Sequence, residues 1–173
     1  MRRRLLTRIA EQSKHGGQAM KFSGDIAILA PREAVFAKVG DPKFFASCVE
    51  GLRNLTEIDR THYTAVMETK IAYLKFRFDV AVEVLRLDPP NEIEAKIEGT
   101  PAGVVGRLSA RSFARMAEEN GATRVSYEIE AALTGKLGSL GQPVLRAKMK
   151  EMERQFAKRV RAAFGAADSG SAP

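Results

Sequence analysis

The chain has 173 residues and a mass of 19.0 kDa, which is enough for one ordinary domain and too little for two full ones. Hydrophobic residues make up 45% and charged residues 28%, and no apolar run approaches the roughly 18 residues of a transmembrane helix, so neither a disordered nor a membrane-spanning chain is expected. The net charge of +7 comes from the two ends, since residues 1–19 carry five basic side chains against one acidic and residues 135–173 carry eight against three.

Residues 1–19 do not share the patterning of the rest of the chain and are expected to form a separate basic extension. They either lie upstream of a start at Met20, which is the favoured interpretation, or form a short amphipathic anchor with Leu5, Leu6 and Ile9 on one side. The folded domain is expected over 20–165, and the small, polar residues 166–173 are expected to be a disordered tail. A cytoplasmic location is expected, because a secretory signal pattern is absent and the single cysteine, Cys48, cannot form an internal disulfide.

Alternating apolar residues predict a first strand from Met20 to Ile28. Two short helices are predicted next, over about 31–39 and 41–48, where prolines and Asp41 supply helix-start signals. The pattern then turns to strands, over 52–58, 63–69, 74–84, 93–99, 108–116 and 125–133. The strict alternation over 74–84 indicates an antiparallel sheet with one solvated face, so the chain is predicted to be an α+β protein with six or seven strands.

One long helix is predicted to close the chain, and Pro143 implies that it begins near Gln142 or is kinked there. Its apolar stripe consists of Leu145, Met149, Met152, Phe156, Val160 and Ala163. Its opposite, basic face consists of Arg146, Lys150, Arg154, Lys158 and Arg161. Because such a stripe must be buried on the sheet, the order of elements favours the helix-grip fold, in which a curved antiparallel sheet wraps round the last helix.

Local sequences within this order resemble the carbon monoxide dehydrogenase G-subunit (CoxG) family of the START-like (SRPBCC) superfamily. The resemblance covers about residues 20–165. It rests on MKFSGDIAILAPREAVFAKVGDP at 20–42, SCVEG at 47–51, LDPP at 87–90, Ala102-Gly103, VSYE at 125–128 and GKLGSLG at 135–141. Glu50 stands where the family usually has proline, which puts the shape of that loop in doubt.

The resemblance implies an accessory protein rather than an enzyme. Members are similar to proteins encoded beside molybdenum-containing carbon monoxide dehydrogenases and related hydroxylases, where they are linked to attachment of the enzyme to the cytoplasmic membrane and to electron delivery to quinone. START-like domains generally hold an apolar ligand between sheet and helix. The expected ligand is therefore a quinone or a lipid, and the expected partner is such a hydroxylase. The protein is expected at the cytoplasmic face of the inner membrane, and no cofactor is expected.

A ligand cavity is expected because the inward strand positions mix small residues with large ones. Tyr127 offers a phenolic donor to an apolar ligand, and Lys148 and Arg159 flank the helix stripe, where they could reach the cavity mouth. The residues expected to line the cavity are Met67, Leu74, Phe76, Phe78, Val80, Met116, Tyr127, Leu145, Met149, Met152 and Phe156. A filled core with a methionine-rich helix is the alternative.

No catalytic or metal-binding constellation is legible in the sequence. His15 and His62 have no second ligand at metal spacing, and Cys48 is expected to be a small packing residue. Two other functions remain open: a START-like enzyme of the cyclase or hydratase type acting on a hydrophobic small molecule, and a purely structural assembly factor with a filled core.

The basic face of the last helix is the expected docking surface for a membrane or a protein partner. At about 1 kcal/mol per lysine or arginine near an anionic bilayer, it could hold the protein to a membrane without insertion, and the attachment should weaken with salt. An ordinary solvated face is the alternative. A nucleic-acid partner is not expected, since the basic ends carry no tryptophan or tyrosine.

Overall fold

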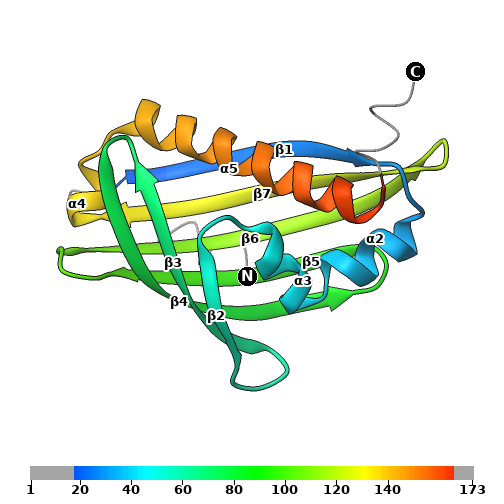
Figure 1. Cartoon of the computed structure of the whole chain (residues 1–173), viewed down its shortest axis with the longest axis horizontal. Coiled ribbons are helices and arrows are strands. Elements are labelled where there is room, and N and C mark those ends of the chain that lie inside the picture. The colour runs from blue at the N-terminus through cyan, green and yellow to red at the C-terminus, as the bar shows by residue number, and fades with distance from the viewer. Residues whose placement is uncertain (1–17, 166–173) are drawn as a thin grey trace.

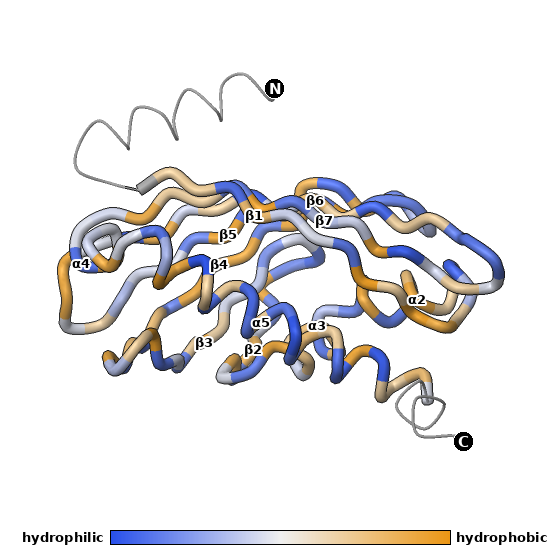
Figure 2. Tube along the Cα trace, turned by 90° about the horizontal axis from the view of Figure 1, so that it is seen from above, coloured by the Kyte–Doolittle hydropathy of each residue, from blue (hydrophilic) through white to orange (hydrophobic). Residues whose placement is uncertain are grey.

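The computed structural model describes residues 18–165, and the predictions for residues 1–17 and 166–173 lie outside them. The elements are β1 (Gln18–Ile28), α2 (Arg32–Val39), α3 (Pro42–Cys48), β2 (Leu52–Glu57), β3 (His62–Ile71), β4 (Leu74–Asp88), β5 (Glu92–Pro101), β6 (Gly106–Glu119), β7 (Ala122–Thr134), α4 (Gly135–Gly138) and α5 (Gln142–Ala163). All seven strands form one antiparallel sheet in the order β1-β7-β6-β5-β4-β3-β2. The sheet curves until β2 and β3 lie on the same side as α5 (Figure 1, Figure 2), which confirms the predicted helix-grip fold.

The helices start where the sequence signals them. Pro31 precedes α2, and the Asp41 carboxylate accepts a hydrogen bond from the Lys43 N–H at 3.0 Å, which satisfies an otherwise unpaired donor at the start of α3. α5 begins at Gln142, with Pro143 in its first turn. The strands extend beyond the strict alternation that predicted them, since β1 already begins at Gln18 and β6 continues to Glu119. The short helix α4 was not predicted.

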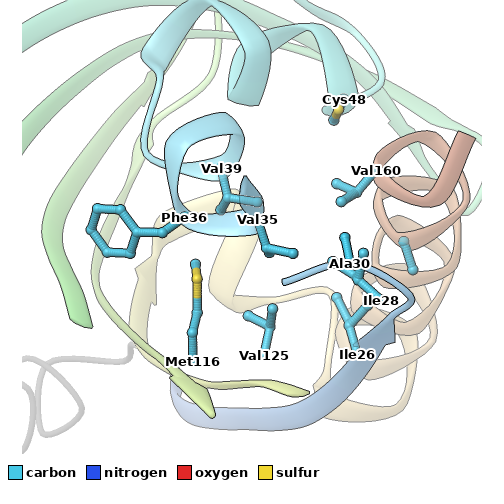
Figure 3. Packing of buried hydrophobic residues seen from close by; sticks show 11 residues of the cluster. Ile26, Ile28, Ala30, Val35, Phe36, Val39, Cys48, Met116, Val125 and Val160 are labelled. Carbon is cyan, nitrogen blue, oxygen red and sulfur yellow. The ribbon is translucent and has the colours of Figure 1, made fainter. Parts of the chain in front are cut away.

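The described core consists of two clusters, one towards each end of α5. The first lies under α2, α3 and the C-terminal half of α5 (Figure 3), and its buried members are Ile26, Ile28, Ala30, Val35, Phe36, Val39, Cys48, Met116, Val125, Ala157 and Val160. The second lies under the start of α5, and its buried members are Met20, Ile71, Phe76, Phe78, Ala131, Leu133, Leu137 and Leu145. Cys48 packs in the first cluster, as predicted, and burial raises the pKa of its thiol.

α5 lies along β1, an edge strand of the sheet (Figure 1). The Arg146 guanidinium donates a hydrogen bond to the Lys21 carbonyl at 3.2 Å, and the Arg161 guanidinium donates to the Ala27 carbonyl at 3.0 Å. Unpaired carbonyls of an edge strand can pair with a strand of another chain. Two residues of the predicted basic face therefore protect the edge of β1, because they occupy two of its carbonyls.

The predicted apolar stripe of α5 faces the sheet with one exception. Its members are buried or half-buried up to Val160, but Ala163 is exposed, contrary to its predicted place in the stripe. α5 ends at Ala163, and the chain then turns so that Phe164 packs on the first cluster in its place.

Candidate functional site

Between the two clusters, the inner face of the sheet is only half-buried. Five half-buried residues of the inner face belong to neither cluster, and we call them the central band: Val82, Ala95, Ile97, Ser112 and Ile129. They are neighbours across the sheet, because Val82 pairs with Ile97, Ala95 with Ser112, and Ser112 with Ile129. Inward side chains of a filled core would be buried, so water-accessible space remains against this part of the sheet.

The middle of α5 offers a second half-buried apolar surface. Met149 and Met152 are half-buried and, like the central band, belong to neither cluster. Methionine side chains are flexible and polarisable, so they adapt to ligands of irregular shape. The combination is a mainly apolar surface with unfilled space, which suits a molecule without strong polar groups.

A pocket of about 560 Å³ opens between α5 and the end of β3. β2 pairs with β3 only as far as Met67, so the last residues of β3 form an open edge. The lining residues are Glu50, Glu68, Thr69, Lys70, Ala72, Val144, Ala147, Lys148, Glu151, Met152 and Gln155. Met152 therefore belongs both to this pocket and to the half-buried apolar surface of α5.

Charged residues and a glycine shape the walls of this pocket. Lys148, whose side chain is 16% exposed, lies 3.8 Å from the Glu151 carboxylate. Gly51 has φ +83° and packs so closely that a Cβ there would lie 2.0 Å from the Glu68 carbonyl oxygen, while the Glu68 N–H donates to the Gly51 carbonyl at 2.9 Å. The loop that precedes β2 is therefore fixed against β3, and glycine is required at position 51.

A polar pair lies between α5 and the β1–β7 part of the sheet. The Tyr127 phenol and the Glu153 carboxylate lie next to each other above Gly24, and burial followed by the charge of Glu153 raises the pKa of Tyr127 above its usual range. A Cβ at Gly24 would lie 2.6 Å from the Glu153 oxygen and 2.8 Å from the Tyr127 oxygen. The pair therefore occupies space that Gly24 leaves free, and its phenol is a hydrogen-bond donor.

The predicted cavity residues fall into three groups. Phe76, Phe78 and Leu145 are buried in the second cluster, and Met116 is buried in the first. Met67, Leu74 and Val80 pack partly buried against the second cluster, and Tyr127 and Phe156 against the first. Met149 and Met152 lie between the clusters. Of all the predicted cavity residues, only Met152 is among those that line the pocket. Their common role in holding a ligand stays a prediction.

The prediction of cavity residues missed Ser112 and Glu153, and the alternation of side chains along the strands could have found the first of them. Ser112 and Met116 are four residues apart in the predicted strand 108–116, so alternation puts Ser112 on the same face as the predicted cavity residue Met116, and its inward position was accessible from sequence. Glu153 was not, because it lies about 80° from Leu145 on the helical wheel, at the edge of the apolar stripe, where a glutamate is usually solvated. Its position depends on the space above Gly24, which only the structure reveals.

The five predicted docking residues of α5 are all exposed. Arg146 and Arg161 contact β1, whereas the side chains of Lys150, Arg154 and Lys158 make no ion pair or hydrogen bond with another residue of the described chain. Lys148 lines the pocket, and the Arg159 guanidinium donates to the Ser47 carbonyl at 3.5 Å. That these two residues reach the mouth of a ligand cavity stays a prediction.

Within residues 18–165, no three His, Cys, Asp or Glu side chains gather in a way that could hold a metal ion. His62 instead contacts Asp59, with 2.8 Å between its Nδ1 and the nearer carboxylate oxygen. The helices of this part of the chain are also too short or too polar for any of them to cross a membrane.

A curved sheet round a C-terminal helix, with unfilled space against the sheet, defines the START-like class of helix-grip domains. The sequence profile of the carbon monoxide dehydrogenase G-subunit (CoxG) family matches residues 24–165, and the chain belongs to this family. No curated protein matches the chain.

Solved structures share the fold at low sequence identity. A conserved protein from Geobacillus kaustophilus is 24% identical, with a TM-score of 0.77 over 83% of this chain and 94% of that one. The Mll3558 protein from Rhizobium loti is 11% identical, with a TM-score of 0.63 over 84% of this chain and 97% of that one. The Zhui aromatase/cyclase from Streptomyces sp. R1128 is 11% identical, with a TM-score of 0.59 over 84% of this chain and 93% of that one.

Proposed function

We propose that this protein is a non-enzymatic accessory protein that holds an apolar ligand, a quinone or a lipid, between the sheet and α5. It helps to attach a molybdenum-containing carbon monoxide dehydrogenase, or a related hydroxylase, to the cytoplasmic membrane. The observation that carries the proposal is the half-buried central band, with Met149 and Met152 on α5, between two well-packed clusters. Membership of the CoxG family supports the accessory role and the choice of partner.

The chemistry of the central band favours a ligand with an aliphatic or isoprenoid part. Four of its five residues are apolar, and each Å² of apolar surface that a ligand removes from water contributes about 25 cal/mol. The pocket beside Met152 supplies an entrance whose charged walls would stay hydrated while the apolar part of the ligand lies deeper.

The basic face of α5 supports the attachment role. Lys150, Arg154 and Lys158 are exposed and their side chains make no ion pair or hydrogen bond within the described residues, so they remain available to anionic headgroups or to an acidic protein surface. Arg146 and Arg161 contribute less to this role, because their guanidinium groups hold the edge of β1.

A substitution that fills the space at the central band tests the ligand site. In Ala95→Phe the added ring would occupy the space next to Ser112, whereas Ala81→Phe places the same ring at an exposed position of the neighbouring strand β4. Isothermal titration with a short-tailed ubiquinone analogue should show binding to the wild type and to Ala81→Phe, and at least tenfold weaker binding to Ala95→Phe. Equal affinities of the three proteins, all folded by circular dichroism, would place the ligand elsewhere.

The Tyr127–Glu153 pair favours a second candidate, a START-like enzyme of the cyclase or hydratase type. Its phenol and carboxylate are a half-buried acid and base beside an apolar space. Turnover of a hydrophobic polyketide-like compound that Glu153→Gln abolishes, while the compound still binds, would favour this enzyme. A third alternative, an assembly factor with a filled core, predicts that no apolar compound binds at all.

A further inference from the structure

Three segments form one end of the molecule, which we call the hairpin end: residues 69–77 around the β3–β4 turn, 101–107 between β5 and β6, and 134–142 around α4. Figure 1 shows them together at the end of the long axis where α5 begins. Ile71 and Leu137 pack in the second cluster, and the Lys136 N–H donates to the Val105 carbonyl at 2.8 Å. The three segments are therefore one fixed surface.

Large apolar side chains project into solvent from this end. Tyr73 at the β3–β4 turn is 84% exposed, and Val105 between β5 and β6 is 86% exposed, with Val104 beside it at 38%. Single exposed apolar residues are common on protein surfaces, but a group at the tips of two adjacent loops is typical of an interaction site.

The charge of the hairpin end has a single sign. Its three segments contain five basic residues, Lys70, Lys75, Arg77, Arg107 and Lys136, and no aspartate or glutamate. The three lysines make no ion pair with another residue in the described part of the chain. Arg107 lies 3.8 Å from Glu98, in an exposed pair that leaves most of its charge available.

Two local features of the β3–β4 turn work against stability. Lys70 and Lys75 are directly opposite each other in the strand register, where like charges repel. Ala72 adopts φ +56° in a two-residue turn, a conformation that asparagine or glycine adopts at lower cost. Local choices that oppose the fold in this way are typical of functional surfaces.

We propose that the hairpin end binds the surface of an anionic bilayer, with Tyr73 and Val105 in the headgroup region and Lys70, Lys75 and Lys136 against the lipid phosphates. Tyrosine suits this environment because its ring is apolar and its hydroxyl is polar. The positive charge without any acid matches an anionic lipid surface. Arg77 and Arg107 add to the same field.

The position of the pocket gives this contact a role. Lys70 and Ala72 of the hairpin end line the pocket together with Val144 and Lys148 of α5. A bilayer at the hairpin end would face the pocket mouth, so an apolar ligand could pass between lipid and protein with little exposure to water. The proposal deepens the proposed function and rests on it, because ligand transfer needs the proposed ligand site and the hairpin end is named as the surface that carries the proposed membrane attachment. If vesicle binding depended on Lys150, Arg154 and Lys158 instead, the hairpin end would fail and the attachment itself would stand.

The chain contains no tryptophan, so one introduced indole reports on its own surroundings. In the full chain, Tyr73→Trp should show a blue-shifted emission with phosphatidylcholine vesicles that contain phosphatidylglycerol, quenching by brominated acyl chains, and loss of both effects at high salt. Ile58→Trp, at a position 63% exposed after β2, is the matched control and should show neither effect. An unshifted emission of Tyr73→Trp, or equal shifts for the two variants, would overturn the proposal.

Charge variants in the Tyr73→Trp background separate the hairpin end from α5. A first triple variant combines Lys70→Gln, Lys75→Gln and Lys136→Gln, and it should bind vesicles about fivefold more weakly per charge removed. A second triple variant combines Lys150→Gln, Arg154→Gln and Lys158→Gln on α5, and it should keep the emission shift. The reverse pattern would overturn the proposal in favour of α5. A shift with a purified molybdenum hydroxylase but not with vesicles would overturn it in favour of a protein partner.

Discussion

At the scale of single residues, the turn between β2 and β3 is organised by one carboxylate. Asp59 accepts hydrogen bonds from the backbone N–H groups of Thr61 and His62, both at 2.9 Å, and also contacts the His62 ring. The backbone bond from Thr61 is the largest cause that lowers the pKa of Asp59 to about 2. The Asp59 hydrogen bond is in turn the largest cause that raises the pKa of His62.

These pKa shifts predict how the turn responds to pH. His62 contributes stability that is complete below its ordinary pKa of 6.5 and is lost as pH rises through its raised value. Asp59 contributes stability that is complete above its ordinary pKa of 3.8 and is lost as pH falls through about 2. The turn is therefore expected to be most stable between these two ordinary values.

An NMR titration of His62, assigned with His62→Gln, checks this expectation. In Asp59→Asn the pKa of His62 should fall towards its ordinary value, and in Glu83→Gln it should fall less, because Glu83 is a smaller cause and lies 3.8 Å from the ring. A His62 pKa that is the same in the wild type and in Asp59→Asn would show that the Asp59 carboxylate does not hold the ring.

At the scale of elements, α5 is held on β1 by residues of its basic face. The prediction from helix periodicity was right that the five basic residues are exposed, but it did not distinguish the two that contact β1 from the other three. The difference depends on which edge of the sheet α5 follows, and neither strand alternation nor helix periodicity contains that information. Arg146 also lies over the Phe22 ring, 5.5 Å from its centre, which adds a cation–π contact to its hydrogen bond.

Truncation of Arg146 or Arg161, which contact β1, should therefore destabilise the protein more than truncation of Arg154, which does not. Arg146→Ala and Arg161→Ala should each lower the free energy of unfolding by about 0.5–1 kcal/mol, since each removes a charged hydrogen bond that is largely exposed. Arg154→Ala on the same face should stay within about 0.5 kcal/mol of the wild type. Urea denaturation measures all three, and an equal loss for Arg154→Ala would show that these contacts do not hold the edge.

At the scale of the whole molecule, the order of elements and the inward face of the strands were predictable, because hydrophobic alternation determines which side chains face inward. Met67, Phe76, Phe78, Met116 and Tyr127 all point to the inner side as expected. How these side chains fill the interior was not predictable, since packing depends on distances between elements far apart in sequence. The division into two clusters is therefore new information, and it moves the expected ligand space to the central band.

The proposed function requires above all that an apolar molecule occupies the space between the two clusters. Native mass spectrometry of the full chain after incubation with a bacterial membrane lipid extract, followed by organic extraction, tests it most directly. One quinone or lipid bound per chain is expected in the wild type and in Ala81→Phe, and none in folded Ala95→Phe. Protein that stays without ligand throughout, or a ligand retained equally by Ala95→Phe, would contradict the claim.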